Sequence, residues 1–143
     1  MTWNHVLVGT DGSEGSRRAL RYAAEEAKTH GARLSVLLAY SLPVPPVTVG
    51  IGPPPLGSAA DRRKDAEGLL DATVAGALGE HPDLDVRTEV VEGSAAGALI
   101  DASRDCDLLV VGTRGHGGFA GMLLGSVSQH LAAHASCTVA VVR

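Results

Sequence analysis

The chain has 143 residues, of which 45% are hydrophobic and 20% are charged. That is enough apolar material for one compact core but too short a chain for two, so we expect a single domain over residues 1–143. The net charge of −4 argues against nucleic-acid or membrane-surface binding, because both require clustered positive charge. The start of the chain lacks a basic segment followed by an apolar run, and no apolar stretch could cross a bilayer, so we expect a cytoplasmic protein.

The chain contains two cysteines, Cys106 and Cys137. They are too few and too far apart in the sequence to indicate a disulfide framework or a paired-cysteine zinc site. We interpret both as small buried residues or bystanders in a reducing compartment.

Strands and helices are predicted to alternate from the start of the chain. Apolar runs at residues 5–8, closed by Gly9, and at Arg33–Tyr40 predict two buried strands. Between them, residues 16–30 place alanines at helical spacing and charged residues mostly elsewhere, which predicts an amphipathic helix ended by Gly31. A crossover of this length joins parallel strands.

The alternation continues after residues 41–58, a proline-rich stretch that we expect to be an extended loop. The later elements are a helix with one apolar face, a strand at about residues 85–91, a helix capped by Ser94, a strand at residues 107–111, a helix at Ser126–His134 and a strand at Thr138–Val142. The apolar face of the first of these helices comprises Ala66, Leu69, Leu70, Thr73, Val74 and Ala77.

Five strands and four helices in this order predict an α/β fold, an open five-stranded parallel sheet with helices on both faces. The expected strand order is 3-2-1-4-5, as in Rossmann-like folds. Ligands of such sheets bind beyond the carboxyl ends of the strands, where the strand order reverses. The segments after the first and fourth strands are therefore the places to search for a site.

The segment after the fourth strand is rich in glycine and leads directly into a helix. Its glycines would let the loop curl and admit a phosphate against bare backbone, and its serines would add hydroxyl donors. Unpaired N–H groups and the positive end of a helix dipole suit phosphate, and Arg114 would supply a cation. On spacing alone, a ligand-free tight connection is an equal alternative. The glycines and serines are Gly112, Gly115, Gly125, Ser126 and Ser128.

This segment resembles the ATP-binding signature of the universal stress proteins, which is glycine, two residues, glycine, nine residues and Gly-Ser. Gly112, Gly115, Gly125 and Ser126 match it at full spacing. The similarity extends over the whole chain, from residues 6–13 at the first strand to residues 134–139. It implies an ATP-binding protein with a regulatory or stress-response role.

The resemblance also implies roles for individual residues. Asp11, with Thr10 beside it, would contact the nucleoside side of ATP, and Tyr40 would meet adenine through its backbone. Val111 and Gly112 would flank the ribose. The phosphates, accompanied by a magnesium ion, would lie on Gly115, Gly125, Ser126, Val127 and Ser128, near Arg114. From local chemistry alone, Asp11 could equally cap the turn into the first helix.

The resemblance further implies a homodimer formed through the last strand, between Val139 and Val142. That strand is an apolar sheet edge that would otherwise invite uncontrolled pairing. Family members often carry proline on both sides of the cysteine before this strand. Here those positions are Ser136 and Thr138, which leaves the dimer geometry open.

We expect ATP binding rather than turnover, in which the nucleotide orders residues 113–124, because no positioned general base is evident. One alternative is a slow ATP-cleaving enzyme of the adenine nucleotide α-hydrolase-like group. That group carries a serine- and glycine-rich loop after the first strand, and residues 9–13 echo it only faintly. The other alternative is a nucleotide-free protein-interaction module, which the intact signature over residues 112–128 disfavours.

Overall fold

The computed structural model describes residues 1–41, 59–113 and 125–143. In chain order the elements are β1 (His5–Gly9), α1 (Glu14–His30), β2 (Arg33–Tyr40), α2 (Ala59–Leu78), β3 (Val86–Glu92), α3 (Ala95–Ala102), the short 3₁₀ helix η1 (Ser103–Asp105), β4 (Leu108–Gly112), α4 (Ser126–His134) and β5 (Thr138–Val142). The strands and α-helices predicted from the sequence are all present, and where bounds were predicted they agree to within two residues, with β2, α4 and β5 matching at both ends.

The five strands form one sheet in the order β3-β2-β1-β4-β5, and every neighbouring pair is parallel. Val8 in the central strand lies opposite Val36 of β2 and Val110 of β4. The predicted fold class and strand order are therefore confirmed. From the central strand β1 the chain proceeds through β2 to β3 at one edge of the sheet. It then returns to β4, on the other side of β1, and ends in β5 at the opposite edge.

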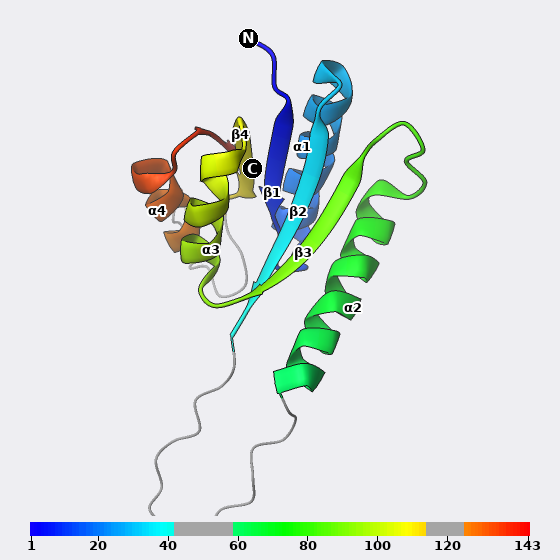
Figure 1. Cartoon of the computed structure of the whole chain (residues 1–143), viewed down its shortest axis with the longest axis vertical. Coiled ribbons are helices and arrows are strands. Elements are labelled where there is room, and N and C mark those ends of the chain that lie inside the picture. The colour runs from blue at the N-terminus through cyan, green and yellow to red at the C-terminus, as the bar shows by residue number, and fades with distance from the viewer. Residues whose placement is uncertain (42–58, 114–124) are drawn as a thin grey trace, which may run out of the picture.

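Helices cover both faces of the sheet, as predicted (Figure 1). α1 and α2 lie on one face, where Val6, Val8 and Leu34 join the buried alanines of α1 in one core. α3 and α4 lie on the other face, where Leu99 and Leu131 pack with Leu7, Leu37 and Leu109 in a second core. Alternate residues of β1 thus enter different cores, as strand geometry requires.

α1 begins two residues earlier than the sequence pattern predicts, because Ser13 caps it. The Ser13 hydroxyl accepts a hydrogen bond from the Ser16 backbone N–H at 3.2 Å, which satisfies one of the amides left open at a helix start. The helix ends where predicted, at Gly31, whose φ of 64° lies in the left-handed region that favours glycine.

α2 buries a narrower face than its sequence predicts. Ala66, Leu70, Thr73 and Val74 are buried, whereas Leu69, which the sequence places on the same apolar face, is 44% exposed. In the described parts of the chain, no helix is both long enough and apolar enough to span a membrane.

The Asp107 side chain connects the start of β1 to the start of β4 by hydrogen bonds. One of its carboxylate oxygens accepts hydrogen bonds from the backbone N–H groups of Asn4, at 2.8 Å, and His5, at 2.9 Å. The Asp107 N–H donates in turn to the His5 carbonyl at 2.9 Å. The two amide donors, Asn4 first, lower the pKa of Asp107 below its ordinary value of 3.8, because they stabilise the charged carboxylate.

This lowered pKa predicts an acid-sensitive contribution to stability. The contribution is complete above the unfolded-state pKa and is lost as the pH falls toward the folded-state pKa, because the unfolded chain takes up the proton first. We expect Asp107→Asn to lose less stability than the wild type between about pH 5 and about pH 3. Urea unfolding at a series of pH values measures this, with the exposed Asp71→Asn as the control. Parallel pH curves for Asp107→Asn and the wild type would contradict it.

Candidate functional site

The carboxyl ends of β1, β2 and β4 lie along one edge of the sheet, the lower edge in Figure 1. After β1 the chain enters α1 on one face, whereas after β4 it leads to α4 on the other face. Opposite crossovers at adjacent parallel strands open a crevice between them, which is the usual ligand site of such sheets. The structure brings the predicted residues Thr10, Asp11, Tyr40 and Gly112 to this edge.

The loop after β1 is held by a network of short polar side chains. Thr10 is buried, and its hydroxyl lies 2.8 Å from the hydroxyl of the buried Ser16. The Thr10 hydroxyl also accepts a hydrogen bond from the Gly12 N–H at 3.3 Å. Thr10 therefore contributes to the site by shaping the loop that carries Asp11.

Asp11 belongs both to this turn and to the wall of the site. Its Oδ1 accepts a hydrogen bond from the Ser13 N–H at 2.9 Å, while Ser13 itself caps α1. Gly12, between them, has a φ of 82°, a conformation that favours glycine. The turn fixes the direction of the Asp11 carboxylate, and the same side chain lines the hollow described below.

Gly112, at the end of β4, is required by a close approach of two backbones. A Cβ at this position would lie 2.9 Å from the Gly15 carbonyl oxygen at the start of α1. Its φ is not in the left-handed region, so at this residue the close approach, rather than an unusual backbone angle, is what requires glycine. It allows β4 to end against α1.

Ser128 ties the start of α4 to the end of β4. Its buried hydroxyl donates to the Gly112 carbonyl at 2.7 Å, and the Gly125 N–H donates to the Thr113 carbonyl. These two bonds hold the first turn of α4 at the carboxyl edge of the sheet. Since the Ser128 hydroxyl is committed to the protein, its backbone N–H is the group that it can offer to a ligand.

The N-cap residue of α4 gives its first turn no side-chain cap. Gly125 is the N-cap residue and makes no side-chain hydrogen bond there, and the Gln129 N–H is the first to reach a helical carbonyl, that of Gly125, at 3.0 Å. The amides before it, those of Ser126, Val127 and Ser128, have no carbonyl four residues earlier within the helix. Amides of this kind, with the helix dipole, attract an anion. The predicted phosphate residues Arg114 and Gly115 lie outside the described residues.

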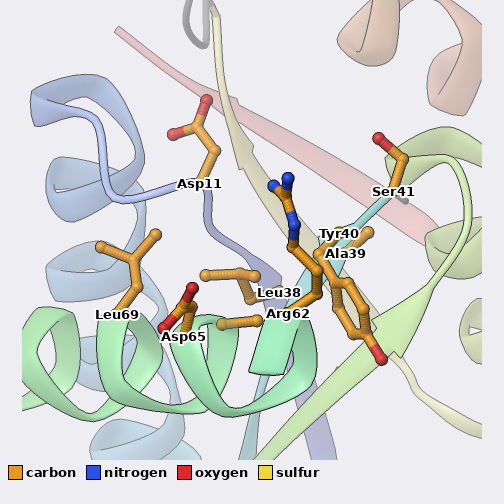
Figure 2. Close-up of a pocket in the computed structure, with 9 residues that line it drawn as sticks. Asp11, Leu38, Ala39, Tyr40, Ser41, Arg62, Asp65 and Leu69 are labelled. Atoms are coloured by element: carbon orange, nitrogen blue, oxygen red, sulfur yellow. The ribbon is translucent and has the colours of Figure 1, made fainter. Parts of the chain in front are cut away.

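A hollow of about 260 Å³ lies between the end of β2 and the first turns of α2 (Figure 2). Its described lining includes two carboxylates, one guanidinium and two residues with hydroxyl groups, and the other lining residues are apolar. In Figure 2 the Arg62 guanidinium projects from α2 between Asp11 and Ser41. The lining residues are Asp11, Leu38, Ala39, Tyr40, Ser41, Arg62, Asp65, Ala66 and Leu69.

Tyr40 contributes to this hollow from the end of β2, while its ring points away from Asp11 in Figure 2. The Tyr40 carbonyl already accepts a hydrogen bond from the Gly93 N–H at 2.8 Å. The register of β2 with β3 turns the Tyr40 N–H toward β3 as well, so a backbone contact between Tyr40 and a base would use the second lone pair of its carbonyl.

The α2 side of the hollow is the part that sequence reasoning misses. Arg62, Asp65 and Leu69 face the hollow from the helix that follows residues 42–58. A charged helix with two arginines in succession gives no local sign of which one faces a site. The structure itself marks this side of the hollow by Leu69, a large apolar side chain that is left exposed beside Asp65 and Arg62.

Comparison with known proteins identifies close similarity to one family. The model of the universal stress protein family matches residues 2–143. A universal stress protein of Thermus aquaticus is 39% identical over 140 residues, which cover 96% of this chain and 97% of the relative. A universal stress protein of Mycolicibacterium smegmatis is 36% identical over 138 residues, and the chain spans 45% of its length.

The fold is also similar to solved structures of this family. One is a universal stress protein in complex with cAMP, which is 30% identical to this chain. It superimposes with a TM-score of 0.73 and covers 100% of this chain and 99% of its own.

Proposed function

The chain belongs to the universal stress protein family, and from this premise we propose that it binds an adenine nucleotide, ATP with Mg²⁺, at the carboxyl edge of β1 and β4. The observation that carries the proposal is the start of α4, which its N-cap residue Gly125 leaves without a side-chain cap and which hydrogen bonds through Ser128 and Gly125 hold beside the end of β4. Helix starts of this kind stabilise an anion by about 0.3–1 kcal/mol, and by about 2 kcal/mol in partly buried geometries.

The charges at the site favour one orientation of the nucleotide. Among the described residues, the hollow beside β2 carries the carboxylates of Asp11 and Asp65 against the guanidinium of Arg62, an arrangement that repels a polyphosphate. Carboxylates are suited to accept hydrogen bonds from ribose hydroxyls or an adenine amino group, and Leu69 offers an apolar surface to a base. The nucleoside therefore occupies the hollow, and the phosphates lie at the start of α4.

Cyclic AMP is a second candidate ligand, favoured by the 30% identical universal stress protein that was solved in complex with cAMP. Its single phosphate carries one negative charge and needs no metal ion, whereas ATP carries a triphosphate that brings Mg²⁺ with it. Competition between the two nucleotides, with and without Mg²⁺, separates these candidates. ATP binding that strengthens with Mg²⁺ supports the proposed ligand.

We propose binding rather than turnover, in a regulatory or stress-response role. In the orientation proposed above, the carboxylates of Asp11 and Asp65 lie beside the nucleoside and away from the phosphates. Asp11 also accepts a hydrogen bond from the Ser13 N–H. A general base for hydrolysis must reach the water that attacks the terminal phosphate. Assay of the binding sample for AMP, ADP, pyrophosphate and phosphate tests the alternative of slow cleavage.

Gly125→Val should weaken ATP binding by at least about tenfold, or about 1.4 kcal/mol. The branched side chain would stand at the helix start where the phosphates approach the amides. The backbone at Gly125, with φ −73° and ψ 165°, is extended and accepts valine, so the protein should fold. Isothermal titration calorimetry with Mg²⁺-ATP measures the change.

Adenosine provides the control for Gly125→Val, because it lacks phosphates and should bind both proteins equally. A variant that has lost adenosine binding as well has lost more than the phosphate site. Equal ATP affinity in the variant and the wild type would reject the proposed phosphate position.

Arg62→Gln should raise the Kd of both ATP and adenosine by about tenfold, because the guanidinium projects over the nucleoside hollow, where it can stack on a base or donate hydrogen bonds. Arg63→Gln is the matched control. It removes the same charge one residue later, where Arg63 is paired with Glu67 at 3.1 Å on the exposed side of α2. Equal losses in the two variants, measured by calorimetry, would mean that overall charge and not the hollow governs affinity.

We propose that the chain forms a homodimer through β5, the edge strand next to β4. Val139 and Val141 pack against one core while Ala140 and Val142 pack against the other, so the strand is apolar on both faces. The Thr113 N–H donates to the Val142 carbonyl at 3.0 Å. The peptide groups of Val142 thus face β4, and alternation along a parallel strand turns those of Val141 toward the free edge.

Val141→Pro should convert the dimer to a monomer, because proline removes an N–H from the free edge and leaves the bonds to β4 in place. Val141→Thr, which keeps the N–H and a similar shape, should remain dimeric. Light scattering coupled to size-exclusion chromatography measures the masses. A monomeric wild type, or a dimeric proline variant, would contradict dimerisation through β5.

A further inference from the structure

Two cysteines that are distant in the sequence meet in the structure. The Sγ atoms of Cys106 and Cys137 are 3.6 Å apart, and both thiols are free. Cys106 is buried and Cys137 is half-buried. The sequence interpretation of both as small buried residues or bystanders agrees with the burial of Cys106, but it does not predict their contact. They form one dithiol at the amino edge of the sheet, the edge opposite the proposed nucleotide site.

Hydrogen bonds and strand pairing hold this dithiol in place. The buried Ser103 hydroxyl accepts a bond from the Ser136 N–H at 2.9 Å and donates to the Ile100 carbonyl at 2.6 Å. Ser136 is the residue before Cys137, and Ser103 lies three residues before Cys106. Beyond the cysteines, Leu108 and Thr138 are paired across β4 and β5. Both segments that carry the sulfurs are thus fixed on each side of the contact.

We propose that Cys106 and Cys137 are an oxidation site, which closes to an intramolecular disulfide by exchange with a small disulfide such as oxidised glutathione. The Cys137 thiolate attacks the small disulfide, which forms a mixed disulfide and releases one small thiolate. The Cys106 thiolate then attacks the Cys137 sulfur and releases the second. The protein loses two protons and two electrons, and one small disulfide becomes two thiols.

The exposure of the two thiols sets the order of these steps. Cys137 is the more exposed and meets the reagent first, whereas Cys106 is buried beside it and resolves the mixed disulfide. Burial raises the pKa of both thiols, so thiolate is scarce at neutral pH and the first step is slow. The second step is intramolecular, between sulfurs that the fold already holds in contact, and is favoured by that proximity.

The disulfide would join the amino end of the edge strand β5 to the segment between η1 and β4. Such a link restricts the unfolded chain and should raise the stability of the oxidised protein. This inference does not rest on nucleotide binding, because none of its residues lies at the carboxyl edge of the sheet.

The test uses the wild-type chain, whose two cysteines make the assignment unambiguous. The folded protein is incubated with excess oxidised glutathione, quenched in acid, alkylated under denaturing conditions and weighed intact by mass spectrometry. We expect a monomer about 2 Da lighter than the reduced chain, which reflects the loss of two hydrogen atoms. It should carry no alkyl group, and dithiothreitol should restore two reactive thiols.

Cys106→Ser and Cys137→Ser are the matched controls, and each should stop at a mixed disulfide or stay reduced. The oxidised wild type should also unfold at a higher urea concentration than the reduced protein. A wild type that stays reduced, accumulates the mixed disulfide or forms only covalent dimers overturns the proposal, and this result does not depend on whether the variants fold.

Discussion

The parallel pairing of β1 with β4 is the constraint on which the rest of the structure depends. These two strands continue to helices on opposite faces of the sheet, so their carboxyl ends form the edge from which both α1 and α4 start. The pairing brings the end of β4 so near the start of α1 that a Cβ at Gly112 would meet the Gly15 carbonyl at 2.9 Å. A larger residue there would have to displace backbone, and with it the surface on which the proposed site rests.

Hydroxyl groups give this edge its rigidity. The Thr10 and Ser16 side chains connect the end of β1 to α1, and the Ser128 side chain connects α4 to the end of β4. All three residues are buried, where a lost hydrogen bond leaves an unsatisfied polar group and costs about 1–3 kcal/mol. The amides at the start of α4 are thus held in position by the protein itself, so less ordering would oppose the proposed binding.

The sequence predicts the fold well because its signals are local, whereas the site combines local and distant contacts. The apolar runs and the alanine face of α1 determine the elements, and long crossovers determine the parallel sheet. Gly125 and Ser126 are predicted as candidate site residues from a local pattern, a glycine-rich segment that leads into a helix. Arg62 and Asp65 are not, because the rotation of α2 over the end of β2 decides which side chains enter the hollow. The Cys106 and Cys137 contact likewise depends on the β4 and β5 register.

The net charge of −4 does not conflict with a polyanionic ligand, because charges farther than about 8 Å are largely screened at physiological ionic strength. What a phosphate meets within that range decides its position. At the start of α4 it meets backbone dipoles, which carry no counterion and need no reorientation. In the hollow it meets Asp11 and Asp65 against Arg62. In the proposed site, the same local contrast would admit phosphate at the start of α4 and exclude it from the hollow, so a nucleotide would be oriented with few cationic side chains.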